Sequence, residues 1–141
     1  MPAEGNHMTT STVRCLLGML GTDVHSKGIR TIAQFLRDAE IEVIYIGEHN
    51  SVAGMAQAAL DEDADIVGLS FSSAAYIQYT RLLIEEMRRR GAGDVPVMVG
   101  GLIHPDDHAE LKAIGVKGIF GPGTTMPEII DFVQGRGRTS A

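Results

Sequence analysis

Short apolar runs alternate with segments of helical periodicity along most of this 141-residue chain, and this alternation limits the possible folds more than any other feature. Each apolar run has the length of a strand, and the segment after it repeats apolar residues at helical spacing. Strands that alternate with helices form a parallel sheet with helices on both faces. The predicted strands are 13–20, 42–46, 66–70, 96–99 and 116–120. The predicted helices are 26 or 27 to 39, 52–60 with Ser51 as its N-cap, 77–90, 106–114 and 126–133.

The number of strand–helix units selects among the parallel-sheet folds. Five units with right-handed crossovers predict a flavodoxin-like, doubly wound five-stranded sheet of strand order 2-1-3-4-5. A closed eight-stranded barrel is excluded because it needs about 250 residues. We expect one domain over residues 12–134, with flexible tails at 1–11 and 135–141. In the third helix, the spacing predicts that Leu82, Leu83 and Met87 face the core.

Charge and composition exclude several functions. The formal net charge of −6 argues against non-specific nucleic-acid binding, because no basic surface outweighs the acidic background. No apolar run approaches the roughly 18 residues of a membrane span, and no signal-peptide pattern is present, so we predict a cytoplasmic protein. Cys15 is the only cysteine, and its place within the first apolar run favours a buried small hydrophobe over a nucleophile.

Polar side chains and glycines follow the predicted strands at the points where the strands end. Asp23 and His25 follow the first strand, and a series of hydroxyls that includes Ser70 and Ser72 ends the third. The carboxyl ends of parallel strands share one edge of the sheet, where ligands bind. Glycines there would let a large flat ligand approach the backbone closely. These glycines are Gly100 and Gly101 after the fourth strand and Gly121 and Gly123 after the fifth.

His25 is the candidate metal ligand of this edge. A neutral imidazole offers a nitrogen lone pair at physiological pH. Asp23 could accept the proton of the other ring nitrogen, which fixes the tautomer and makes the imidazole a better donor. Taken alone, however, an Asp-x-His pair is more often a solvated turn, so the interpretation depends on the spacing of the remaining elements.

That spacing resembles the cobalamin-binding domain of the adenosylcobalamin-dependent mutases, over nearly all of residues 13–133. The fingerprint of this family is Asp-x-His-x-x-Gly, then Ser-x-Leu, then Gly-Gly, in that order. The segment 119–124 is similar to the acyl-CoA mutase branch, and to methylmalonyl-CoA mutase in particular. The matching residues are Asp23, His25 and Gly28 for the first part, Ser70 for the second, and Gly100 and Gly101 for the third.

The resemblance implies a specific binding mode for cobalamin. The cofactor's own dimethylbenzimidazole base leaves the cobalt, and His25 replaces it as the lower axial ligand with Asp23 behind it. The displaced nucleotide tail enters a slot beside Ser70 and the Gly100–Gly101 edge. The implied reaction is homolysis of the cobalt–carbon bond followed by radical rearrangement of an acyl-CoA. The remaining residues expected to contact the cofactor are Ser26, Gly28, Ser72, Gly121, Gly123 and Thr124.

Two residues depart from the family pattern. Ser72 stands where the fingerprint has leucine, so we expect a more polar pocket for the tail. Methylmalonyl-type domains commonly have a lysine six residues before the histidine, and here that residue is Met19. Both changes leave cobalamin binding as the expectation and weaken methylmalonyl-CoA as the expected substrate.

The resemblance also implies a partner. The chain has no room for the TIM barrel that binds the acyl-CoA, so a separate large subunit is expected to supply it. One alternative is a corrinoid carrier for methyl transfer, but residues 1–11 are too short for the helical cap domain of such carriers. Another is a sensory cobalamin module, which would need an output domain. A response-regulator receiver is set aside because the third strand ends in serines and a phenylalanine rather than a phosphoacceptor aspartate.

A second cluster of polar residues is interpreted as a helix start. In the segment 104–108, Asp106 and Asp107 suit the positive end of a helix dipole, and Pro105 suits a first helical turn. We therefore prefer this interpretation to a second metal site. The sequence leaves open whether His49, Tyr76 or Tyr79 touches the cofactor.

Overall fold

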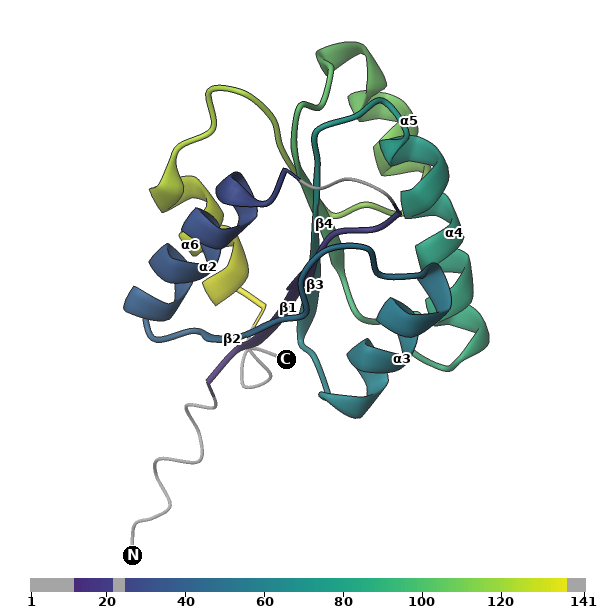
Figure 1. The fold of residues 1–141 in the computed structure, drawn as a ribbon, viewed down its shortest axis with the longest axis horizontal. Helices are drawn as coiled ribbons and strands as arrows, with labels where there is room; N and C mark the ends of the chain where they lie inside the picture. The colour runs from purple at the N-terminus through teal and green to yellow at the C-terminus, as the bar shows by residue number, and fades with distance from the viewer. Residues whose placement is uncertain (1–11, 22–24, 137–141) are drawn as a thin grey trace, which may run out of the picture.

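The computed structural model describes residues 12–21 and 25–136, and the predicted tails lie largely or wholly outside this part of the chain. Its centre is a parallel five-stranded sheet of order β2-β1-β3-β4-β5, as the alternation predicted (Figure 1). Every neighbouring pair of strands is parallel. The strands are β1 (Arg14–Gly18), β2 (Glu42–Tyr45), β3 (Ile66–Phe71), β4 (Val97–Gly101) and β5 (Gly118–Phe120).

Helices cover both faces of the sheet. Figure 1 shows a group of helices on each side of it. One group is α2 (Lys27–Asp38) and α6 (Met126–Gln134). The opposite layer contains α3 (Val52–Asp61), α4 (Tyr76–Arg89) and α5 (His108–Ile114), with the short 3-10 helix η1 (Pro105–Asp107) directly before α5. Among the described residues, no helix is long and apolar enough to cross a membrane.

The pleat of the strands divides the core into two clusters. Cys15 and Leu17 of β1 pack with α2 and α6, whereas Leu16, between them in sequence, packs with the opposite helices. Adjacent strand residues point to opposite faces of a sheet, which explains the division. Burial raises the pKa of the Cys15 thiol to about 12, so this side chain is a neutral core residue. The interpretation of Cys15 as a small hydrophobe is thereby confirmed.

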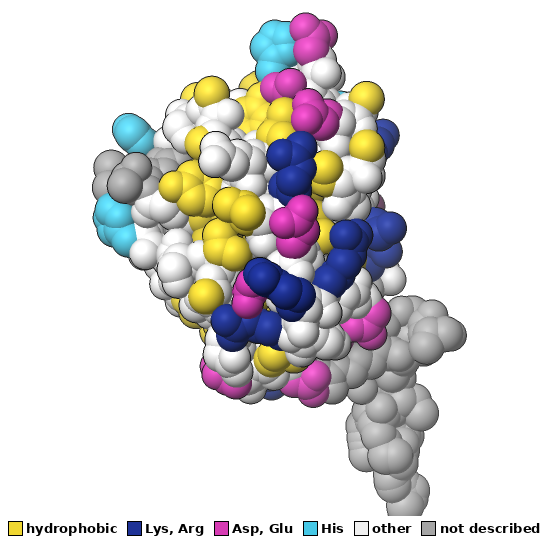
Figure 2. Space-filling view, turned by 90° about the vertical axis from the view of Figure 1, so that its right-hand side faces the viewer, with side chains coloured by type: hydrophobic (Ala, Val, Ile, Leu, Met, Phe, Trp, Pro, Cys, Tyr) yellow, Lys and Arg dark blue, Asp and Glu magenta, His cyan; other side chains and the backbone are white. Residues whose placement is uncertain are grey.

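The inward face of α4 differs from the expectation at one residue. Leu83 and Met87 are buried, as predicted, but Leu82 is 44% exposed. Leu83 and Met87 are four residues apart and share one face of the helix, with Thr80 and Ile84 beside them. Leu82 lies about 100° around the helix from Leu83, so the prediction that it faces the core was wrong. Charged and hydrophobic side chains intermix on this side of the molecule (Figure 2).

Two helix starts are fixed by side chains. Ser51 caps α3 by accepting a hydrogen bond from the Gly54 amide. Thr125 and Glu128 form a reciprocal capping box at the start of α6. The hydrogen bonds from Thr125 hold the pKa of the Glu128 carboxyl below its usual value. These caps fix where α3 and α6 begin relative to the ends of the strands before them.

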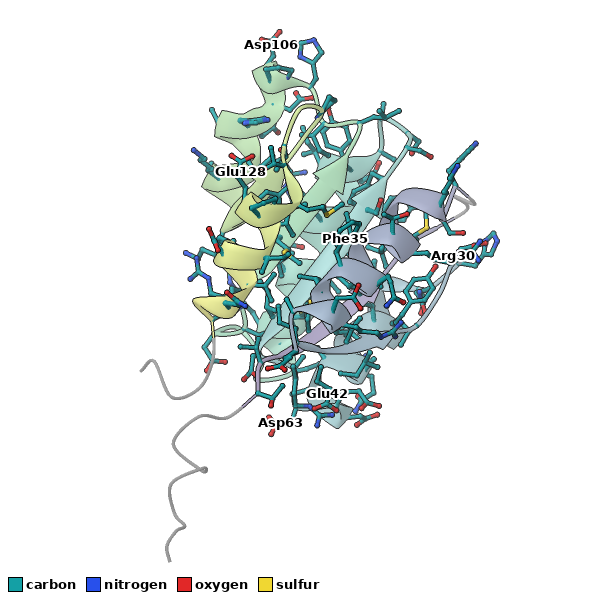
Figure 3. All side chains as sticks on the ribbon, turned by 90° about the vertical axis from the view of Figure 1, so that its left-hand side faces the viewer. Arg30, Phe35, Glu42, Asp63, Asp106 and Glu128 are labelled. Atoms are coloured by element: carbon teal, nitrogen blue, oxygen red, sulfur yellow. The ribbon has the colours of Figure 1, made fainter. Side chains whose placement is uncertain are left out.

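Figure 3 shows the polarity of the sheet. Asp106, which follows the carboxyl end of β4, lies at one end of the molecule, and Glu42 and Asp63, near the amino ends of β2 and β3, lie at the other. The polar segments that follow β1, β3, β4 and β5 therefore belong to the end marked by Asp106. This is the edge at which the sequence predicted a site.

Candidate functional site

His25 lies between β1 and α2, and its side chain is exposed. Its imidazole contacts Ser72, the first residue after β3, whose Oγ lies 3.0 Å from Nδ1. The two residues are 47 positions apart in the sequence, and they meet because β1 and β3 are adjacent parallel strands. The prediction that the segments after the first and third strands converge is therefore confirmed.

The segment between β1 and α2 contains other predicted site residues. Asp23 lies outside the described residues, so its role behind His25 stays a prediction. Ser26 is buried, and its Oγ accepts hydrogen bonds from the Arg30 guanidinium at 3.1 and 2.9 Å. The hydroxyl of Ser26 thus ties the start of α2 to the next turn of the helix.

Gly28, in the first turn of α2, has no steric reason to be glycine. A Cβ added there would have no heavy atom within 4 Å, and the residue is exposed. Glycine in a helix costs roughly 0.5–1 kcal/mol relative to alanine. A glycine that the surrounding protein does not require is consistent with a ligand that approaches this turn closely.

A narrow apolar slot lies between α2, α6 and the sheet, at the carboxyl ends of the strands. Ser70 and Gly100 line it and are register partners on β3 and β4, and Phe120 of β5 is the next partner across. The cavity measures about 30 Å³, which is the share of liquid volume of about one water molecule. The other lining side chains are Leu17, Ile29, Ile32, Met98 and Ile129, together with the backbone of Gly68, Leu69 and Val99.

The apolar walls of this slot were missed as site residues, because Ile29 and Ile32 read simply as the core face of a helix. The sequence of β3 did contain an indication of the slot, because the small residues Gly68 and Ser70 alternate with large residues there. A Cβ on Gly68 would lie 2.6 Å from Leu17 Cδ2 and 2.8 Å from Met98 Cε. Gly68 therefore makes room for the two side chains that form the floor of the slot.

Gly101 has a structural role that is independent of any ligand. Its φ is +106°, and an added Cβ would lie 2.1 Å from the carbonyl oxygen of Phe71. Only glycine is compatible with both features. Gly101 does not line the slot, whereas its neighbour Gly100 does. Contact between Gly101 and a cofactor stays a prediction.

The turn after β5 contains the last three predicted residues. The Thr124 amide donates to the Gly121 carbonyl at 3.2 Å, and Gly123 has a φ of +91°. None of the three lines the slot in the part of the chain that the structure describes. Their contact with a nucleotide tail therefore also stays a prediction.

Met19, the residue at the place of the family's lysine, is fully buried in the cluster beneath α2 and α6. A lysine there would have to place its charge in an apolar core, which is costly without a partner. The apolar side chain suits the observed packing. The replacement of the family's lysine by Met19 therefore fits the packing of the core.

Tyr76 and Tyr79 both contact segments at the carboxyl edge. The buried Tyr76 hydroxyl donates to the Asp107 carboxylate and accepts from the His104 amide at 3.1 Å. The hydrogen bond to Asp107 raises the pKa of the Tyr76 phenol. Tyr79 packs against Gly21, where an added Cβ would lie 2.5 Å from the phenol oxygen. Both tyrosines thus support the loops of the edge.

The remaining histidines do not form a second metal site within the described residues. Nδ1 of His104 accepts a hydrogen bond from the Asp106 amide and so caps η1, as the helix-start interpretation predicted. No group of three His, Cys, Asp or Glu side chains suited to a metal ion occurs in residues 12–21 and 25–136. His49 is exposed and has a left-handed φ of +62°.

Comparisons with known proteins agree with this geometry. Residues 13–130 match the B12 binding domain family. The chain is 35% identical over 134 residues to the pivalyl-CoA mutase small subunit of Xanthobacter autotrophicus, covering 95% of this chain and 90% of that protein. It is 32% identical over 127 residues to the 2-hydroxyisobutanoyl-CoA mutase small subunit of Aquincola tertiaricarbonis, covering 90% and 93%.

A solved structure supports the fold. The crystal structure of a cobalamin-binding protein from Desulfitobacterium hafniense superposes with a TM-score of 0.77 at 16% sequence identity. The similarity covers 89% of this chain and 60% of that one. At this identity the superposition shows a shared fold and does not extend to function.

Proposed function

Because this chain belongs to the B12-binding domain family and is similar along its length to acyl-CoA mutase small subunits, we propose that it is the cobalamin-binding small subunit of such a mutase. The cofactor would be adenosylcobalamin, and His25 would hold it through its cobalt. When bound, it supplies the cobalt–carbon bond whose homolysis starts a radical isomerisation.

The observation that carries this proposal is the position of His25 relative to the slot. The imidazole is exposed in the segment after β1, and the slot is lined by Ser70 and Gly100 near the carboxyl ends of β3 and β4. A cofactor that presents a metal to the rim and a nucleotide tail to the interior needs both features side by side. The residues present fit this group in their chemistry.

Each residue of the site has a separate task. The lone pair of Nε2 in His25 is the donor to the metal, because Nδ1 is engaged by Ser72. The aliphatic walls of the slot suit the flat apolar faces of a displaced base. Ser70 and Gly100 at its end provide a hydroxyl and bare backbone for polar atoms of the tail.

The volume of the slot adds a condition. The cavity measures only about 30 Å³, so we expect the slot to widen when a nucleotide base enters it. We infer that the wall that moves is α2, because it contributes Ile29 and Ile32 to the lining of the slot. We therefore expect binding to displace α2 relative to the sheet.

The first experiment is a spectroscopic titration of the chain with adenosylcobalamin, because ligation by a protein imidazole in place of the cofactor's base changes the visible spectrum. We expect the spectrum of a histidine-ligated cofactor for the wild type and its loss for His25→Ala. His104→Asn is the matched control, since it removes an exposed histidine of the same edge and keeps an acceptor at the start of η1. An unchanged spectrum in His25→Ala would refute the assignment.

The partner and substrate need a second experiment. The chain is mixed with adenosylcobalamin and a mutase large subunit of the TIM-barrel type, and isomerisation of branched acyl-CoA substrates is measured. We expect turnover only when both chains and the cofactor are present. Tight binding of methylcobalamin together with transfer of its methyl group, and no isomerisation with any large chain, would indicate a corrinoid carrier instead.

A further inference from the structure

The contact between Ser72 and His25 joins two strand ends at the candidate metal ligand. Ser72 Oγ and His25 Nδ1 are 3.0 Å apart, a normal hydrogen-bond distance. We propose that Ser72 is a positioning residue for His25, whose hydroxyl holds the imidazole through Nδ1 so that Nε2 stays available for the metal. This inference rests on the proposed function.

Ser72 lies outside the slot because it follows the paired end of β3. Ser70 points to the face of α2 and α6 and lines the slot, and Phe71 packs in the opposite cluster. Ser72 comes after the last paired residue of β3 and does not line the slot. The expectation that it makes the tail pocket more polar is thus replaced by a role at the imidazole.

The chemistry of a hydroxyl suits this role. A serine oxygen both donates and accepts, whereas a neutral imidazole has one protonated and one unprotonated nitrogen. A metal bond at Nε2 requires the proton on Nδ1, and Ser72 would then accept that hydrogen bond, either in the role predicted for Asp23 or sharing it with Asp23. Such contacts to the second nitrogen fix the tautomer and ring orientation of metal-bound histidines. A leucine, the residue of the family pattern at this position, cannot make this contact.

The position of Ser72 allows the role to be tested without unfolding the protein. Ser72 is half-buried and lies outside both core clusters. Its neighbour Ser73 is exposed, which makes Ser73→Ala a matched control. Ser72→Thr keeps the hydroxyl, and Ser72→Ala and Ser72→Leu remove it.

The first readout uses the cofactor-free chain. Nitrogen NMR of the His25 ring, at one fixed pH where the imidazole is neutral, reports the balance of the two tautomers. We expect Ser72→Ala and Ser72→Leu to change that balance, and Ser72→Thr and Ser73→Ala to keep that of the wild type. An unchanged balance in both Ser72→Ala and Ser72→Leu would overturn the inference.

The second readout is the spectroscopic titration with adenosylcobalamin. Loss of a partner behind a metal ligand typically costs 10–100-fold in affinity, so we expect about a tenfold loss for Ser72→Ala and recovery in Ser72→Thr. Wild-type affinity and spectrum in Ser72→Ala would overturn the inference and leave the proposed function intact. If the wild type itself gives no histidine-ligated spectrum, the proposed function fails, and the positioning role fails with it.

Discussion

The two faces of the sheet are packed differently at the carboxyl ends of the strands. Along β3, Leu69 and Phe71 fill the face of α3, α4 and α5, and the Phe71 ring lies 6.2 Å from that of Tyr76. Gly68 and Ser70, which alternate with them, point to the other face and leave the slot beneath α2. Because alternate residues of a strand belong to different cores, a site can be built on one face while the other face stays tightly packed.

The largest expected effect concerns the closely packed face. Leu83 of α4 is fully buried there, so Leu83→Ala should lower the free energy of unfolding by about 2–5 kcal/mol, measured by urea denaturation. Cobalamin affinity of the folded variant should match the wild type, because Leu83 does not line the slot. A large loss of affinity in a variant that is still folded would show that the two faces are coupled.

The next effect concerns the slot itself. Ser70→Leu should fill the cavity and reduce cobalamin affinity by about 100-fold or more, equivalent to roughly 2.7 kcal/mol of binding free energy. Equilibrium titration measures the loss, and Ser73→Leu, an exposed position near the same strand end, is the matched control. Equal losses in both variants would mean that the slot has no particular role.

A smaller effect is expected at Gly28. Gly28→Ala meets no neighbouring atom, so the cofactor-free chain should become more stable by at most about 0.5–1 kcal/mol. If the cofactor approaches this turn, affinity should fall by about tenfold, equivalent to roughly 1.4 kcal/mol. Thermal unfolding with and without cobalamin measures both effects. A variant that gains stability and keeps its affinity would remove Gly28 from the site.

The smallest effect is at the start of α6, which forms one wall of the slot. Thr125→Ala removes a helix cap and should cost about 1 kcal/mol in the free energy of unfolding at neutral pH. Thr125 holds the pKa of Glu128 below the ordinary value of 4.5. The stabilisation from this ionised carboxylate is thus present above pH 4.5 and is lost as the pH falls through the lower pKa of the folded state. The alanine variant keeps the backbone hydrogen bond to Glu128, so urea denaturation across this range should show both proteins losing stability in acid and their difference shrinking only by the contribution of the Thr125 hydroxyl.

The architecture could be predicted because the sequence patterns that specify it are local. Apolar runs, helical spacing and glycines at strand ends specify the sheet order and the shared edge, and all of these were confirmed. The contact between Ser72 and His25 could not be predicted, because it depends on how two loops 47 residues apart meet in space. Leu82 was misplaced because it lies about 100° around the helix from Leu83 and so falls outside the buried face.

The slot is bounded by residues from both ends of the fold. Leu17 comes from the first strand and Ile129 from the last helix, more than a hundred positions later in the chain. No shorter segment contains all of its walls, so a growing polypeptide has no complete tail pocket until the last helix has docked. Binding of a ligand in this slot would therefore be possible only after synthesis and folding of the whole domain are finished.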